Sequence, residues 1–138
     1  MNQEDITDIK TRAYQQIGKL FFAVAFADRK IHANEVKQLQ DTYRKAWLHQ
    51  DHSSDEYGEE ATHQIEIVFD YLVEEHDEIN SFEILEEFDE FKSAHPSFFT
   101  KALNKRIMDS AIAIADSYAG VNKSEMVTIS KISEILKD

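Results

Sequence analysis

The chain has no cysteine among its 138 residues, which excludes several kinds of site. Disulfide bridges, thiolate zinc sites, iron–sulfur clusters and cysteine nucleophiles all need the missing thiol. One proline and three glycines are few for this length, which favours helices over a turn-rich β fold. The most apolar stretch covers only residues 20–27, whereas a helix that spans a membrane needs about 20 apolar residues. We therefore expect an all-α protein without direct membrane insertion.

The beginning of the chain also lacks the marks of a targeting signal. Residues 1–9 are polar and include Glu4, Asp5 and Asp8, whereas a secretory signal needs a basic start and an apolar run. The length, 42% hydrophobic residues and 30% charged residues are typical of one globular domain. The expectation is a single cytoplasmic domain over residues 1–138.

Positive charge is scarce and unevenly placed. There are 15 basic residues against 27 acidic ones, for a formal net charge of −12. Residues 46–91 contain no lysine or arginine but hold 16 of the acidic residues. Binding to nucleic-acid phosphates needs clustered lysine and arginine, so we expect no nucleic-acid partner.

Apolar residues recur every three to four positions, the spacing of helices with one buried face. We predict a compact bundle of six to seven helices over residues 5–27, 34–48, 59–79, 81–93, 96–118 and 123–137, the fifth breaking near Asn104. The predicted core comprises Ile6, Ile9, Ala13, Ile17, Leu20, Phe21, Val24, Val36, Leu39, Tyr43, Trp47, Ile65, Val68, Phe69, Leu72, Ile84, Leu85, Phe88, Phe91, Phe99, Leu103, Ile107, Ala111, Ile114, Met126, Ile129, Ile132 and Leu136.

Helix starts are marked as well. Asn80 with Glu83, and Asn122 with Glu125, have the spacing of a capping box. Pro96 suits the first turn of a helix, where its missing N–H costs nothing.

Two segments far apart in the chain share a pattern. Residues 20–28 (LFFAVAFAD) and 107–116 (IMDSAIAIAD) both end in Ala-x-Ala-Asp, and each is followed by a glutamate, Glu35 or Glu125. This pattern resembles the TerB-like family, named for a tellurite-resistance protein. The resemblance implies an all-helical bundle with two pseudo-repeated hairpins, here near residues 6–48 and 97–137. It also implies a stress-response or metal-resistance setting.

In the TerB-like family, acidic residues of the two repeated turns are suspected of binding a metal or a protein. The matching positions here are Asp28, Glu35, Asp116 and Glu125, with His32 as a further ligand. His32 and Asn122 stand where the family often has a second aspartate. Two interpretations stay open: each Asp accepts N–H bonds from its own turn, or each Asp and Glu pair holds a divalent cation.

Acidic residues follow a helical spacing after Gly58. Glu66, Asp70, Glu74, Asp77 and Glu78 fall on one helix face, and we expect them to have no cation to pair with. Because such a face repels itself, we expect it either to keep the protein soluble or to dock a basic protein partner, with weakly held divalent cations as a further alternative.

Catalytic patterns are absent from the sequence. Glu60 and His63 form one Glu-x-x-His half of a di-iron site without the second half, and no Gly-x-Ser-x-Gly turn occurs. We expect a non-catalytic scaffold or adaptor without a cofactor. The alternatives are a divalent-metal-binding or metal-sensing domain and, more remotely, a metal-dependent hydrolase. The aromatic set Phe82, Phe88, Phe91, Phe98 and Phe99 predicts core packing. The alternative is that one or two of these rings lie on a partner groove.

Overall fold

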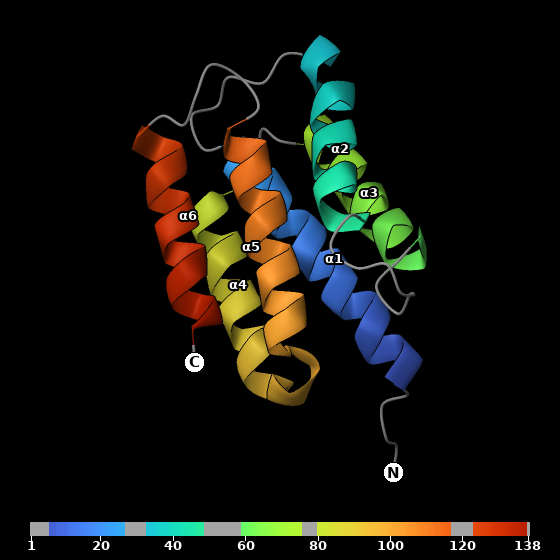
Figure 1. Ribbon diagram of the computed structural model, residues 1–138, viewed down its shortest axis with the longest axis vertical. Helices are drawn as coiled ribbons and strands as arrows, with labels where there is room; N and C mark the ends of the chain where they lie inside the picture. Colours follow the sequence, from blue (N-terminus) through green and yellow to red (C-terminus); the bar gives the residue numbers. More distant parts are fainter. Residues whose placement is uncertain (1–5, 27–32, 49–58, 76–79, 117–122, 138) are drawn as a thin grey trace.

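The computed structural model describes residues 6–26, 33–48, 59–75, 80–116 and 123–137. These residues form six α-helices and one short 3-10 turn, with no β-strand among them. The elements are α1 (Ile6–Ala25), α2 (Ala33–Leu48), α3 (Glu59–Glu74), α4 (Ser81–Ala94), η2 (Pro96–Phe98), α5 (Lys101–Ala115) and α6 (Lys123–Leu136). The predicted all-α helical bundle is confirmed (Figure 1).

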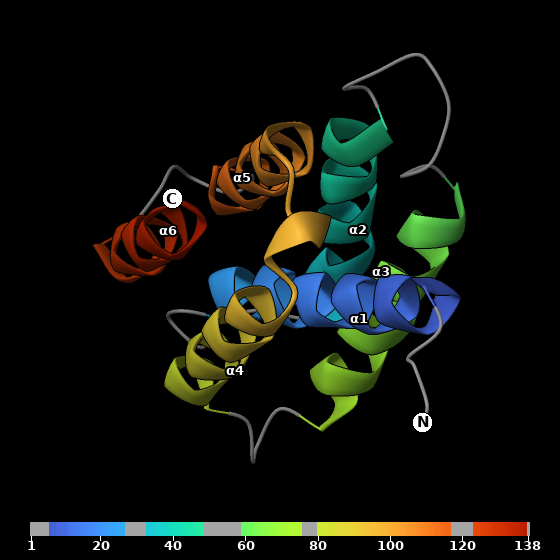
Figure 2. The same cartoon turned by 90° about the horizontal axis from the view of Figure 1, so that it is seen from below.

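Helix α1 is the central element of the bundle. It packs against α3, α4, α5 and α6, and Figure 2 shows it crossing the middle of the molecule with other helices on both sides. The side chains of Leu20, Phe21, Phe22, Ala23 and Val24 are all buried. Five consecutive buried residues cover every side of a helix, which is typical of a helix enclosed by its neighbours.

The contact between α1 and α3 is unusually close at Gly18. A Cβ atom added there would lie 2.7 Å from the Ile65 carbonyl oxygen and 3.2 Å from the Val68 Cβ. Glycine therefore lets the backbone of α3 approach α1 where any other residue would push it away.

The predicted repeat of two hairpins is not confirmed. Helices α5 and α6 do pack against each other, but α1 packs mainly against α3, and α2 packs mainly against α5. The helix partners of α1 and α2 are thus distant in the sequence, which the motif alone does not indicate.

Side-chain caps determine where α4 and α5 begin. Asn80 Oδ1 accepts hydrogen bonds from the backbone N–H groups of Phe82 (2.8 Å) and Glu83 (3.3 Å), as the capping-box spacing predicts. Thr100 Oγ1 accepts from Leu103 N at 3.1 Å and starts α5.

The predicted helix 96–118 is wrong at its start and in the position of its break. Pro96 opens only the 3-10 turn η2, and α5 begins at Lys101 after the Thr100 cap. Asn104 lies inside α5 and does not interrupt it. Its side-chain amide lies 3.4 Å from the Leu136 carbonyl oxygen, so this residue links α5 to the end of α6.

Aromatic rings join the helices in two groups. In the first, the Phe21 ring of α1 lies 5.1 Å from Tyr43 and 6.3 Å from Trp47 of α2, and Tyr43 lies 5.3 Å from Phe69 of α3. The buried Arg106 of α5 stacks over Trp47 at 5.5 Å. These contacts fix α2 between α1, α3 and α5.

The second aromatic group joins α4 to the segment before α5. Phe88 and Phe91 pack edge-on against Phe99, with ring centroids 5.5 and 6.2 Å apart, and all three are buried. Phe98 is half-buried and meets Tyr14 of α1 at 6.0 Å. The core prediction is therefore confirmed for these rings, but it is wrong for Phe82, which is 55% exposed.

Most other predicted core residues of the described part are buried or half-buried. Met126 is the exception: it lies on the predicted stripe of α6 but is 58% exposed. Ile6 belongs to α1, but its side chain lies outside the described part. None of the helices described here combines the length and apolar character needed to cross a bilayer.

Candidate functional site

The four predicted metal residues are only partly placed by the structure. Asp116 is the exposed C-cap of α5, where its own N–H donates to the Ile112 carbonyl oxygen at 2.9 Å. Glu35 and Glu125 fall in the first turns of α2 and α6. Asp28 and His32 lie outside the described residues. Within the described part of the chain, no three His, Asp or Glu side chains are grouped to hold a metal ion.

The acidic series of α3 faces α2 at its first two positions. The half-buried Glu66 forms an ion pair with Arg44, and Asp70 accepts a hydrogen bond from the Gln40 amide. The expectation that this series has no cation to pair with is therefore wrong for Glu66. The sequence misses the pair because its two members lie on different helices.

These contacts change the protonation behaviour of two α2 side chains. Burial raises the pKa of the Tyr43 hydroxyl, and the negative charges of Glu66 and Asp70 raise it further. The hydrogen bond to Glu66 raises the pKa of the Arg44 guanidinium. Glu66 and Asp70 are thus part of the packing between α2 and α3.

The rest of α3 presents a mixed outer surface. Glu74 is exposed at the last position of the helix, whereas Asp77 and Glu78 lie outside the described residues. Ile67 and Tyr71, one turn apart, are 48% and 64% exposed. Two members of the predicted series are exposed in the described part of the chain: Glu74, and Asp70 with its hydrogen bond from Gln40.

Helix α4 carries the main described acidic surface. Its exposed acidic residues are Glu83, Glu86, Glu87, Asp89 and Glu90. Glu87 pairs with Lys19 of α1 at 3.0 Å. For the other four, no ion pair is found among the described residues. We call Glu83, Glu86, Asp89 and Glu90 the α4 acidic face.

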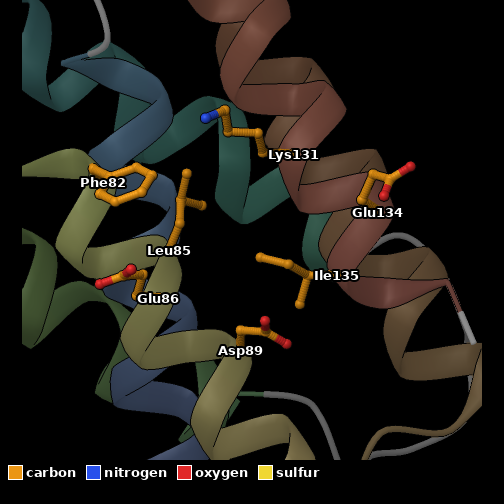
Figure 3. Close-up of a pocket in the computed structure, with 7 residues that line it drawn as sticks. All are labelled: Phe82, Leu85, Glu86, Asp89, Lys131, Glu134 and Ile135. Carbon is orange, nitrogen blue, oxygen red and sulfur yellow. The ribbon is translucent and has the colours of Figure 1, made fainter.

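A groove of about 400 Å³ runs between α4 and α6. Its walls are Phe82, Leu85, Glu86 and Asp89 of α4, and Lys131, Glu134 and Ile135 of α6 (Figure 3). Lys131 extends across the groove, and its Nζ lies 5.2 Å from the centre of the Phe82 ring. The groove thus combines apolar side chains with three carboxylates and one ammonium group.

The sequence predicts Phe82 to be a core residue and indicates no role for Lys131. One signal does separate Phe82 from the core. It falls off the stripe Ile84, Leu85, Phe88 and Phe91, and it shares a helix face with Glu86 and Asp89, four and seven positions later. Its contact with Lys131 joins two helices and has no signature in the sequence.

No protein-family model, no curated protein and no solved structure matches this chain. The TerB-like resemblance therefore rests on the two Ala-x-Ala-Asp motifs and their following glutamates, and it stays a hypothesis.

Proposed function

We propose that this chain is a non-catalytic helical scaffold or adaptor that docks a basic protein partner on its acidic side, within residues 59–90. The observation that carries the proposal is the α4 acidic face, whose four carboxylates are exposed and have no ion pair among the described residues. In keeping with the TerB-like resemblance, we place the domain in a stress-response or metal-resistance setting.

Within the acidic region, we propose α4 rather than α3 as the docking site. Glu66 is half-buried and paired with Arg44, and Asp70 is exposed but hydrogen-bonded to Gln40, so α3 offers a basic partner fewer unpaired carboxylates than α4. Glu83, Glu86 and Glu90 lie three and four positions apart and repel one another along α4. A basic partner would relieve this repulsion, and the negative field would steer it over a Debye length of about 8–10 Å.

The test is affinity capture from a cell lysate with the full chain as bait, followed by mass spectrometry. One variant changes Glu83, Glu86 and Glu90 to glutamine. Its matched control changes the exposed Asp8, Asp41 and Asp116 to asparagine, which removes the same charge from other helices. We expect the first variant to lose a basic protein that the wild type and the control retain.

Capture of the same proteins by all three baits would contradict the proposal. The folding of both variants is checked by their melting temperatures. The first should melt close to the wild-type temperature, because relief of like-charge repulsion along α4 offsets the loss of the favourable Glu83 charge in its first turn.

A further inference from the structure

The groove between α4 and α6 extends over two turns of α4. The two helices run in the same direction, and little of α4 touches α6 (Figure 1). From Phe82 to Asp89, α4 rises about 10 Å, which is two helical turns. Helices that dock in grooves are held by apolar anchors at positions i, i+3 or i+4, and i+7, which span the same two turns.

The apolar side chains of the groove are arranged to receive such anchors. Leu85 is buried, Ile135 is half-buried and points from α6 toward α4, and Phe82 exposes 55% of its surface at one end (Figure 3). The exposed Phe82 beside the buried Leu85 offers an apolar surface that, in the described part of this chain, only Lys131 partly covers.

The charges around this seat select a cationic occupant. Glu86 and Glu134 flank the groove on opposite sides, and Asp89 lies at the end away from Phe82 (Figure 3). The net charge of the whole chain is −12, so nucleic acid, anionic lipid and a second copy of the chain would all be repelled. A basic polypeptide is the complementary partner.

Lys131 already occupies the position that a partner's cation would take. Its Nζ lies 5.2 Å from the centre of the Phe82 ring, within the range of a cation–π contact. An arginine from a partner would stack on the same ring face more effectively, because its guanidinium is planar and less strongly hydrated than an ammonium group. Lys131 is therefore an internal competitor for the groove.

We propose that the α4–α6 groove binds two turns of an amphipathic basic helix from a partner protein, and that Lys131 holds the aromatic end of the groove in its absence. The proposal rests on the proposed function, since it specifies the partner class and the seat. The partner helix inserts apolar side chains against Leu85 and Ile135 and places arginine or lysine near Phe82, Glu86 and Asp89.

The probe is a fluorescent peptide of about 14 residues, or four turns, with leucine at i, i+3 and i+7 and arginine on both flanks. A scrambled peptide of the same composition is its control. Anisotropy titrations with the full chain measure both dissociation constants. We expect the patterned peptide to bind more tightly than the scrambled one, because only it presents an apolar stripe.

Four variants locate the binding site. Phe82→Ser should weaken binding by about tenfold or more, as expected for a central aromatic contact. Glu86→Gln and Asp89→Asn should each weaken it several-fold, with a larger effect at low salt. Lys131→Gln should strengthen it by about two- to five-fold, the effect of removing a competing exposed cation–π contact. Lys101→Gln, on the exposed surface of α5, is the matched control and should change little.

The outcomes separate this proposal from the broader one. If Phe82→Ser and Lys131→Gln both bind like the wild type, the peptide sits elsewhere and the groove assignment is overturned. Equal binding of patterned and scrambled peptides also overturns it, while leaving docking by charge intact. If neither peptide binds and the captured proteins do not depend on Glu83, Glu86 and Glu90, both proposals fail. Lys131→Gln is expected to bind the patterned peptide more tightly. A folding defect would weaken binding, so it could not produce this result.

Discussion

At the residue scale, Tyr43 links packing to pH. Its ring packs among Phe21 and Phe69, and its pKa is raised by burial and by the carboxylates of Glu66 and Asp70. The hydroxyl of a tyrosine in an unfolded chain has a pKa of about 10. Above that pH the unfolded chain loses the Tyr43 proton while the folded chain keeps it, so unfolding becomes progressively easier as the pH rises.

We predict that titration of Tyr43 lowers the free energy of unfolding by up to about 1.4 kcal/mol for each pH unit above pH 10. Tyr43→Phe keeps the ring and removes the proton, so its unfolding free energy should fall less steeply between pH 9 and 11. Urea unfolding at a series of pH values measures the slope. Tyr71→Phe, at a 64% exposed position, is the control. An equally steep fall for Tyr43→Phe would contradict the assignment.

Also at the residue scale, two glutamates of α3 should respond in opposite ways to neutralisation. Glu66→Gln breaks the pair with Arg44, and we expect a loss of about 0.5–1 kcal/mol in unfolding free energy. Glu74→Gln removes a negative charge from the helix C-terminus, and we expect a gain of a few tenths of a kcal/mol. Denaturant melts measure both changes, and a double-mutant cycle with Arg44→Gln should recover the loss as coupling energy.

A neutral or stabilising Glu66→Gln would show that the carboxylate is not held by α2. The sequence already placed Glu66 and Glu74 on one face of a helix, because spacing within a helix determines that much. It did not indicate their different surroundings, because Arg44 reaches Glu66 only once α2 and α3 have packed.

At the scale of elements, the closeness of α1 and α3 depends on one missing side chain. Gly18→Ala adds a Cβ at 2.7 Å from the Ile65 carbonyl oxygen, and backbone cannot rotate away as a side chain can. Overpacking costs about 1–3 kcal/mol, partly offset by the helix propensity of alanine. We predict a net loss of about 1–2 kcal/mol, or a melting temperature lower by roughly 4–8 °C.

Thermal unfolding followed by circular dichroism measures the effect of Gly18→Ala. Ser130→Ala, at an exposed position of α6, supplies the matched gain in helix propensity without a clash, and it should melt at or slightly above the wild-type temperature. An unchanged melting temperature for Gly18→Ala would mean that α3 moves aside at little cost.

The sequence predicts the positions of the helices better than it predicts which helices pack together. The apolar stripes predicted all six helices, and Asn80 marked the start of α4 because a cap is a local feature. Which helices pack together, by contrast, depends on residues far apart in the sequence. The contact of α2 with α5 depends on how Trp47 and Arg106 stack across the bundle. The exposure of Phe82 has a local signal, because this residue falls off the apolar stripe of α4; only its contact with Lys131 depends on where α6 lies.

At the scale of the whole molecule, the adaptor and metal-binding alternatives give different responses to divalent cations. If docking is the function, calcium, magnesium, manganese or zinc at about 1 mM should change the melting temperature only slightly. A specific cation at about 100 times its dissociation constant would add about 2.7 kcal/mol, or roughly 8 °C or more. Thermal shift assays measure the difference.

A large shift with one cation, abolished by Asp28→Asn or Asp116→Asn, would favour the metal-binding alternative over docking. The Glu83→Gln variant is the control, since it removes a carboxylate outside the repeated turns. A small shift with every cation that the control also shows would indicate general screening of the acidic surface.

The central place of α1 also bears on how the chain folds during synthesis. Helix α1 precedes all of its packing partners in the sequence, and α4, α5 and α6 come in the last part of the described chain. On the ribosome, the part of the α1 surface that packs against α4, α5 and α6 therefore stays uncovered until those helices emerge. The bundle can therefore be completed only after the C-terminal helices have been synthesised, and until then the nascent chain exposes apolar surface that a chaperone can bind.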